Sequence, residues 1–341
     1  MLDILFFAGI LISLSFIIII HEAGHFFVGK LLKFPIKEFG FGYPPRLWTK
    51  KFKDTVYSIN WILFGGFVRF FDHRIDGNDG GTEENSFSRQ KIWKRASVMG
   101  AGIFINFLLG WLLVSFIFMV GVPAELLVTQ VQSNSIAEQN GIKSGDIIID
   151  FQKVNALTGF LEEQKGKEVI LDIKRADTKF SIKFISPLEN NGGRLGVFLS
   201  ETGVEKQNFF MSFIEGFKTS AMIMYGSVLG LVKLAILAIK DVGALNSVVG
   251  PVGIVSIAVE TSKLGFIYFI QVMAMISLGL AAFNIFPIPG LDGGRLFLIL
   301  VEKIKGSPIS EKAEIRIFGI SFLALALLAI FVTVKDIWML F

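Results

Sequence analysis

The sequence lacks cysteine and contains only three histidines among 341 residues. The absence of cysteine excludes a disulfide framework and any thiolate ligand, so a metal ion would have to be held by nitrogen and oxygen atoms. Charged residues are also scarce, at 18% of the chain, whereas 52% is hydrophobic and the mean hydropathy is +0.63. Ordinary soluble proteins of this length are less apolar, and we predict an α-helical integral membrane protein of the lipid bilayer.

Four long stretches carry few or no charged residues, and each is long enough as a helix to cross or nearly cross a hydrocarbon core of about 30 Å. They are residues 4–28, 96–122, 265–291 and 317–334. We predict four transmembrane helices there. The first stretch lacks the basic start and the small-residue cleavage site of a cleavable signal, so we interpret it as a retained span.

The distribution of Lys and Arg predicts the orientation of these helices. Basic residues are concentrated between the first two spans, and the short segment between the last two is basic as well. Because Lys and Arg accumulate in cytoplasmic loops, both segments should face the cytoplasm. The N-terminus and a domain that follows the second span are then expected on the extracytoplasmic side.

Residues 209–240 are also rich in apolar side chains, but their four charged residues fall within about 60° of one another on a helical wheel. Only 14 residues separate Lys218 from Lys233, which is short for a span. We predict an interfacial amphipathic helix on the membrane surface. The alternative is a fifth span paired with a sixth around residues 248–259.

The first span contains three ionisable groups in the motif "HEAGH". His21 and His25 are four residues apart and share one face of a helix, with Glu22 beside them. In H-E-x-x-H the imidazoles bind zinc and the glutamate acts as general base. The motif has only three fixed residues and also arises by chance in unrelated proteins. The alternative is that the two histidines and the glutamate only form hydrogen bonds within a helix bundle. Ionisable groups in lipid, however, usually mark a function.

A hydrolytic zinc site needs a third protein ligand and an open position. His73 is the only other histidine, but it lies in the polar stretch "FDHRIDGNDGG" and is interpreted as a solvated loop residue. The stronger candidate is Asp292 in "FNIFPIPGLDGGRL", where prolines and glycines interrupt a helix near the inner end of a span. The alternative for Asp292 is an acid that caps the next helix.

Together, "HEAGH" in the first span and "NIFPIPGLDGG" in the third resemble the site-2 protease family of intramembrane zinc metalloproteases. The resemblance is closest to the branch of the bacterial regulator of sigma-E protease (RseP), and it covers nearly the whole chain in the same order. "VGPVGI", residues 249–254, matches a further signature of the family, and Asn106 in "GAGIFINF" resembles a family position less specifically.

The resemblance implies a role for each candidate residue. His21, His25 and Asp292 would be the Zn²⁺ ligands and Glu22 the catalytic base. Asn284, from the family's N-x-x-P-x-P-x-L-D-G pattern, would handle the substrate. The implied partners are single-span membrane proteins, such as anti-sigma factors or signal-peptide remnants, in a bacterial inner membrane; no nucleic-acid partner is expected.

Two further segments complete the predicted organisation. Residues 39–70 read as a β-hairpin, either a membrane-re-entrant element to which a substrate strand adds or an ordinary cytoplasmic loop. Residues 123–190 read as one small α/β domain similar to a bacterial PDZ domain. We expect this domain to limit by size which proteins approach the active site, rather than to bind a peptide in a specific pocket. Residues 1–122 and 261–341 would then form the membrane core, with a linker and the surface helix in residues 191–260.

We expect regulated intramembrane proteolysis by a zinc metalloendopeptidase. One alternative is a non-catalytic membrane scaffold whose PDZ-like domain binds partners. Another is a metal or proton transporter, although the sequence shows neither the internal repeats nor the polar residues along several spans that such a protein would be expected to have.

Overall fold

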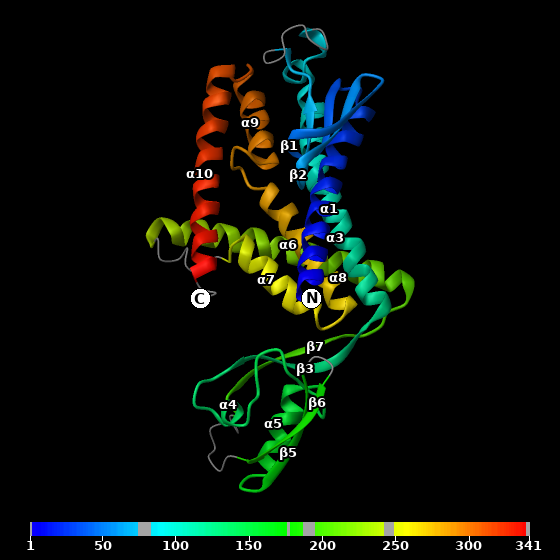
Figure 1. The fold of residues 1–341 in the computed structure, drawn as a ribbon. Helices are drawn as coiled ribbons and strands as arrows, with labels where there is room; N and C mark the ends of the chain where they lie inside the picture. The colour runs from blue at the N-terminus through cyan, green and yellow to red at the C-terminus, as the bar shows by residue number, and fades with distance from the viewer. Residues whose placement is uncertain (1, 74–82, 176–177, 187–194, 242–248, 339–341) are drawn as a thin grey trace. The chain divides into compact units, whose positions relative to one another are not determined.

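The computed structural model describes residues 2–73, 83–175, 178–186, 195–241 and 249–338. The chain divides into two compact units. The first consists of Met1–Val114 and Gly216–Phe341, and the second of Ser115–Glu215. Figure 1 shows that long helices dominate the first unit, whereas the second contains most of the β-strands.

Each of the four predicted spans coincides with a helix over most of its length. These helices are α1 (Leu2–Leu31), α3 (Ile92–Val120), α8 (Phe266–Asn284) and α10 (Glu311–Trp338). Within the described residues, five helices are long and apolar enough to cross a membrane; the fifth is α6 (Phe209–Lys240). Several long apolar helices together with β-sheets are the architecture of a membrane protein with added strands.

The third predicted span ends earlier than its apolar stretch. α8 stops at Asn284 rather than continuing to residue 291, and α9 (Asp292–Lys305) begins after a short turn. Pro287 and Pro289 lack the amide hydrogen that a continuing helix needs, and Gly290 has a φ of +106°. The break places Asp292 at the first position of a new helix.

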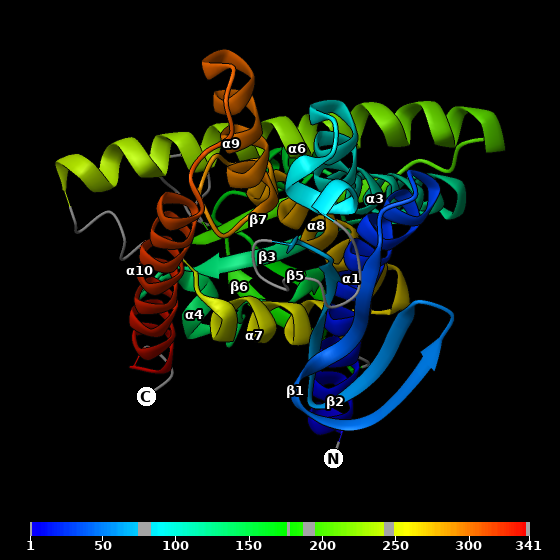
Figure 2. The same ribbon diagram turned by 90° about the horizontal axis from the view of Figure 1, so that it is seen from above.

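Residues 209–240 form one continuous helix, as expected. Figures 1 and 2 both show α6 running across the direction of α10. The region of the alternative sixth span contains α7 (Pro251–Ser262), which has only 12 residues. About 20 residues are needed to cross a bilayer as a helix, so α7 is too short to pair with α6 as a second crossing.

The predicted hairpin is present as β1 (Ile36–Phe52) and β2 (Thr55–Phe70). The register shifts along β1, so that Glu38 lies opposite both Val56 and Arg69. Asn60 of β2 is fully buried and donates hydrogen bonds to the carbonyls of Phe41 and Gly42 in β1, both at 3.1 Å. Two short 3₁₀ helices, η1 (Glu83–Asn85) and η2 (Phe87–Arg89), follow it along the chain.

The second unit is a five-stranded sheet with the order β6-β5-β4-β3-β7. Its elements are β3 (Val122–Val131), α4 (Ile136–Gln139), β4 (Ile147–Ile148), α5 (Val154–Glu163), β5 (Glu168–Arg175), β6 (Thr178–Ile185) and β7 (Val197–Val204). β7 lies beyond the predicted range 123–190, and it joins the sheet by pairing with β3. Its sequence "VFLSETGV" alternates weakly, because none of its side chains is fully buried on either face of the sheet.

An ion pair between a buried aspartate and a partly exposed arginine stabilises this unit. The carboxylate of Asp146 is fully buried and accepts hydrogen bonds from Arg175 Nε at 2.6 Å and Nη2 at 2.7 Å. It also accepts from the amide of Lys143 at 2.8 Å. The hydrogen bond to Asp146 raises the pKa of Arg175, so the guanidinium remains charged at neutral pH.

Candidate metal centre

Two histidines of α1 face the same point. His21 and His25 are one helical turn apart, their ring centroids are 4.8 Å apart, and the rings are nearly perpendicular. Both side chains are buried, with exposed fractions of 8% and 5%. The apolar run that precedes them keeps this part of the chain helical, so the spacing of four in the sequence becomes a shared face.

Asp292 reaches the two histidines from the start of α9. Its Oδ2 atom lies 3.0 Å from His21 Nε2 and 3.2 Å from His25 Nε2. The two glycines that follow are required by this approach, because a Cβ at Gly293 or Gly294 would overlap backbone carbonyl oxygens of the preceding turn. The sequence "LDGG" thus lets the chain fold tightly enough to present the carboxylate to α1.

The hydrogen bonds around this cluster leave its lone pairs free. His25 Nδ1 lies 2.7 Å from the carbonyl oxygen of Val98 and donates to it, which leaves a lone pair on Nε2 of the neutral imidazole. The two Nε2 atoms are 3.2 Å apart. Asp292 Oδ2 is buried and receives no hydrogen bond, although both nitrogens are near it.

These distances fit a bound cation. Ligands of a tetrahedral zinc ion with bonds of about 2.0 Å are about 3.3 Å apart, close to the separations found here. Two imidazole nitrogens and one carboxylate oxygen are also a suitable ligand set for zinc. Among the described residues, His21, His25 and Asp292 are the one group of metal-binding side chains that converges in this way.

Gly102 of α3 shapes this cluster and was not identified from the sequence. A Cβ at this position would overlap His25 Nε2 and would lie 2.5 Å from His21 Cε1. Only a glycine therefore lets α3 pass so close to the two rings. The sequence contains the run "GAG" inside a predicted span, and such small residues indicate that a helix packs closely against a neighbour. The run does not show which side chains the helix packs against.

Glu22 lies beside the cluster and contacts the hairpin. The backbone amide of Val68 in β2 hydrogen-bonds to its carboxylate. Gly66 also passes close by, since a Cβ there would lie 3.6 Å from Glu22 Cγ. The hairpin therefore runs next to the residue expected to act as the base.

The remaining candidates lie around this centre. Asn284 is the last residue of α8, at the start of the turn that leads to Asp292. Asn106 is buried one turn after Gly102, and neither polar atom of its amide group has a hydrogen-bond partner. His73 is outside the cluster and half-buried rather than solvated, because its backbone amide donates to Ser86 Oγ at 3.0 Å and holds the chain against η2.

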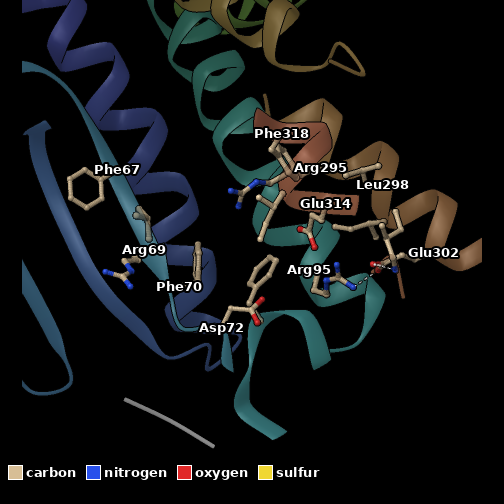
Figure 3. A pocket seen from close by; sticks show the side chains of 15 residues that line it. Phe67, Arg69, Phe70, Asp72, Arg95, Arg295, Leu298, Glu302, Glu314 and Phe318 are labelled. Carbon is tan, nitrogen blue, oxygen red and sulfur yellow. Dashed lines mark hydrogen bonds and ion pairs between the residues drawn. The ribbon is translucent and has the colours of Figure 1, made fainter. Parts of the chain in front are cut away.

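A cavity of about 530 Å³ is lined in part by Phe67 and Val68 of β2. Figure 3 shows side chains that line it, with Phe67 among those labelled. α3, α9 and α10 form most of the remaining wall, together with Asp72, Phe87 of η2 and Ile309. Arg95 and Glu302 form a buried ion pair of 2.6 Å on its surface, and the guanidinium of Arg295 lies over the ring of Phe318 at 5.4 Å. The cavity thus reaches the strand that contacts Glu22.

The fold and this cluster define a class of protein: a helical membrane protein in which the two histidines of an H-E-x-x-H helix meet a distant aspartate. The chain belongs to peptidase family M50, whose family model matches residues 9–328. The family predicted from the two motifs is therefore confirmed.

The chain is similar to other proteins over nearly its full length. "Putative zinc metalloprotease CPE1693" of Clostridium perfringens is 32% identical over 332 residues, which cover 96% of this chain and 97% of that protein. "Putative zinc metalloprotease FN1322" of Fusobacterium nucleatum is 30% identical over 352 residues, with 97% and 98% covered. "Membrane metalloprotease ARASP, chloroplastic" of Arabidopsis thaliana is 28% identical over 346 residues, with 95% of this chain and 76% of that protein covered.

Proposed function

We propose that this protein is a zinc metalloendopeptidase that hydrolyses a peptide bond in or near the transmembrane segment of single-span membrane proteins. The observation that carries the proposal is the convergence of His21, His25 and Asp292 at one point within apolar helices, beside Glu22. The names of the relatives, which include zinc and membrane metalloproteases, support the same cofactor and reaction for this chain.

The residues divide the chemistry among them. His21, His25 and Asp292 would hold zinc, which supplies polarisation of a peptide carbonyl and acidification of a water molecule when bound. The carboxylate of Glu22 accepts the proton of the attacking water and transfers it to the leaving amine. The hydrogen bond from Val68 keeps the Glu22 carboxylate in place beside the reacting groups.

The hairpin and Asn284 would hold the substrate. A transmembrane helix has its carbonyls already bonded, so a protease must bind it in extended form. A strand added next to β2 would lie beside Glu22, because Val68 and Gly66 already pass there. The amide side chain of Asn284, at the end of α8, would bind the backbone of that strand.

We further infer four transmembrane helices, α1, α3, α8 and α10, with α6 on the membrane surface. If α6 crossed the membrane once, the basic residues at 303–316 would face the extracytoplasmic side, against the preference of Lys and Arg for cytoplasmic loops. A second crossing by α7 would return them to the cytoplasmic side, but α7 is too short for that. The N-terminus and the PDZ-like unit would then be extracytoplasmic in a bacterial inner membrane. There, the unit would limit which partly trimmed proteins, such as anti-sigma factors or signal-peptide remnants, approach the centre.

The test is cleavage of a single-span protein by the purified protein in lipid, beside a Glu22→Gln form. We expect the Glu22→Gln form to keep its zinc and to lose activity by at least about 100-fold, because it lacks the proton acceptor. Glu162→Gln makes the same chemical change at an exposed position of α5 and should leave cleavage unchanged. Equal cleavage by wild-type and Glu22→Gln protein would refute the proposal.

A further inference from the structure

The motif "VGPVGI" is not explained by the metal centre. Gly250 is the residue before α7, and Pro251 is its first residue. The amide of Gly250 donates to Asp336 Oδ1 at 3.2 Å, and the amide of Gly253 donates to Asp336 Oδ2 at 2.8 Å. One carboxylate from the last turns of α10 therefore satisfies two free amides at the start of α7.

The same contact explains why both motif positions are glycine. A Cβ on Gly250 would lie 2.7 Å from Asp336 Oδ2 and 2.6 Å from Val332 Cγ1. A Cβ on Gly253 would lie 3.1 Å from Asp336 Oδ2. Larger side chains would push α10 away from α7 and separate the carboxylate from the amides.

This carboxylate is the main attachment of α10 to α7. Among the residues of α10 whose side chains are described, Val332 and Asp336 are the two that are buried, and both contact Gly250. Lys335 is 3.9 Å from Asp336 Oδ1, at the outer limit of an ion pair. The rest of the helix has a largely exposed apolar surface, as expected for a lipid-facing span.

α7 in turn forms one wall of a large cavity within the first unit. The cavity has a volume of about 1420 Å³, and α1, α6 and α8 form its other walls. Its lining is almost entirely apolar; the one charged residue, Glu260, pairs with Lys263 at 2.8 Å. Ile18 and Phe283 belong to the lining, and they lie one turn before His21 and directly before Asn284.

We propose that Asp336 is a positioning residue that holds α7 as a wall of this cavity, and that the cavity receives the apolar transmembrane segment of the substrate. The proposal rests on the function proposed above. A helix of about 10 Å diameter and 1.5 Å rise occupies roughly 120 Å³ per residue, so the volume corresponds to about three helical turns. Its continuity with Ile18 and Phe283 leads such a segment toward the metal centre.

Binding is measured separately from cleavage, in the Glu22→Gln form reconstituted in lipid with a labelled single-span protein. Adding Asp336→Ala should weaken binding by about tenfold while the zinc content stays the same. The matched change is Lys335→Met, which removes the neighbouring charge and should leave binding unchanged. Equal binding with and without Asp336, or loss of zinc together with binding, would overturn the positioning role.

A disulfide between α7 and α10 should restore binding to the Asp336→Ala form if Asp336 acts by holding these two helices together. The chain has no cysteine of its own, so Gly250→Cys and Val332→Cys can be introduced into the Asp336→Ala form without background thiols. A Cβ on Gly250 would lie 2.6 Å from Val332 Cγ1, so the two introduced side chains would meet at the contact between α7 and α10. The oxidised form should regain wild-type binding and the reduced form should not; failure of the bridged form to regain binding would contradict the proposal.

The occupant of the cavity is tested by filling it. Gly279 lines the cavity, and a Cβ there would meet nothing within 4 Å, so Gly279→Phe reduces the free space. It should weaken binding of the single-span protein by about tenfold, whereas Gly319→Phe on α10, where nothing lies within 4 Å either, should not. Unchanged binding in Gly279→Phe would mean that the cavity holds lipid only. Tight binding without cleavage by wild-type protein would contradict the proposed function but not this inference.

Discussion

His25 and Asp292 lie near opposite ends of the sequence, yet His25 Nε2 is 3.2 Å from Asp292 Oδ2. In the neutral form of His25, Nε2 has no proton to donate, because the imidazole donates through Nδ1 to Val98; the aspartate oxygen only accepts. Two acceptors at this distance in a buried site repel one another unless a cation lies between them. The pair therefore accounts for both the H-E-x-x-H motif and the "LDGG" turn.

Gly102 provides a test of how tightly α3 must pack on the centre. Gly102→Ala places a methyl group against both imidazoles, so we expect zinc affinity to fall and cleavage to decrease roughly 100-fold. Gly100→Ala, two residues away on the same helix, meets nothing within 4 Å and should gain about 0.5–1 kcal/mol of stability. Zinc analysis and cleavage rates of the two variants decide between a specific contact and a general intolerance of alanine in α3.

The ion pair of Arg95 and Glu302 should be important for the stability of the first unit. Each side chain is only 9% exposed, and the pair joins the start of α3 to α9, which presents Asp292. Glu302→Gln leaves the arginine buried without its anion, and we expect a loss of about 3–5 kcal/mol. Thermal unfolding in detergent measures this loss, and the double change Arg95→Met with Glu302→Met should recover part of it. A melting temperature equal to that of wild-type protein would show that water reaches the pair.

Asp146 should contribute to the stability of the second unit and not to that of the first. Asp146→Asn removes the charge that Arg175 and the amide of Lys143 share, and we expect a loss of about 2 kcal/mol within residues 115–215. Limited proteolysis of the full chain should cut this unit faster, while the zinc content remains at the wild-type level. Loss of zinc in this variant would show that the two units are coupled in stability.

The sequence was sufficient for the parts of the fold that depend on local pattern. Apolar length predicted the helices of the four spans, and a spacing of four predicted that His21 and His25 share a face. β-branched and aromatic residues predicted the hairpin of β1 and β2, and alternation predicted β5 and β6. The prolines and glycines around Asp292 made it a candidate ligand, and the family resemblance implied the role, because no local pattern shows which side chain completes a centre formed by distant helices.

The remaining features depend on contacts between segments far apart in the sequence. Gly102, Gly250 and Gly253 look like ordinary small residues until the groups that approach them are known. β7 is an edge strand whose partner, β3, precedes it by more than sixty residues, so its weak alternation did not reveal it. The end of α8 at Asn284 was also misplaced, because hydropathy continues through a turn that prolines and glycines define.

Zinc content is the most direct test of the central claim that His21, His25 and Asp292 hold one metal ion. Purified wild-type protein should contain about one zinc per chain, and Asp292→Ala should lose most of it, because one of the three ligands is gone. His73→Ala removes the histidine outside the cluster and should keep the wild-type content. Full zinc occupancy in Asp292→Ala, or loss of zinc in His73→Ala, would contradict the account.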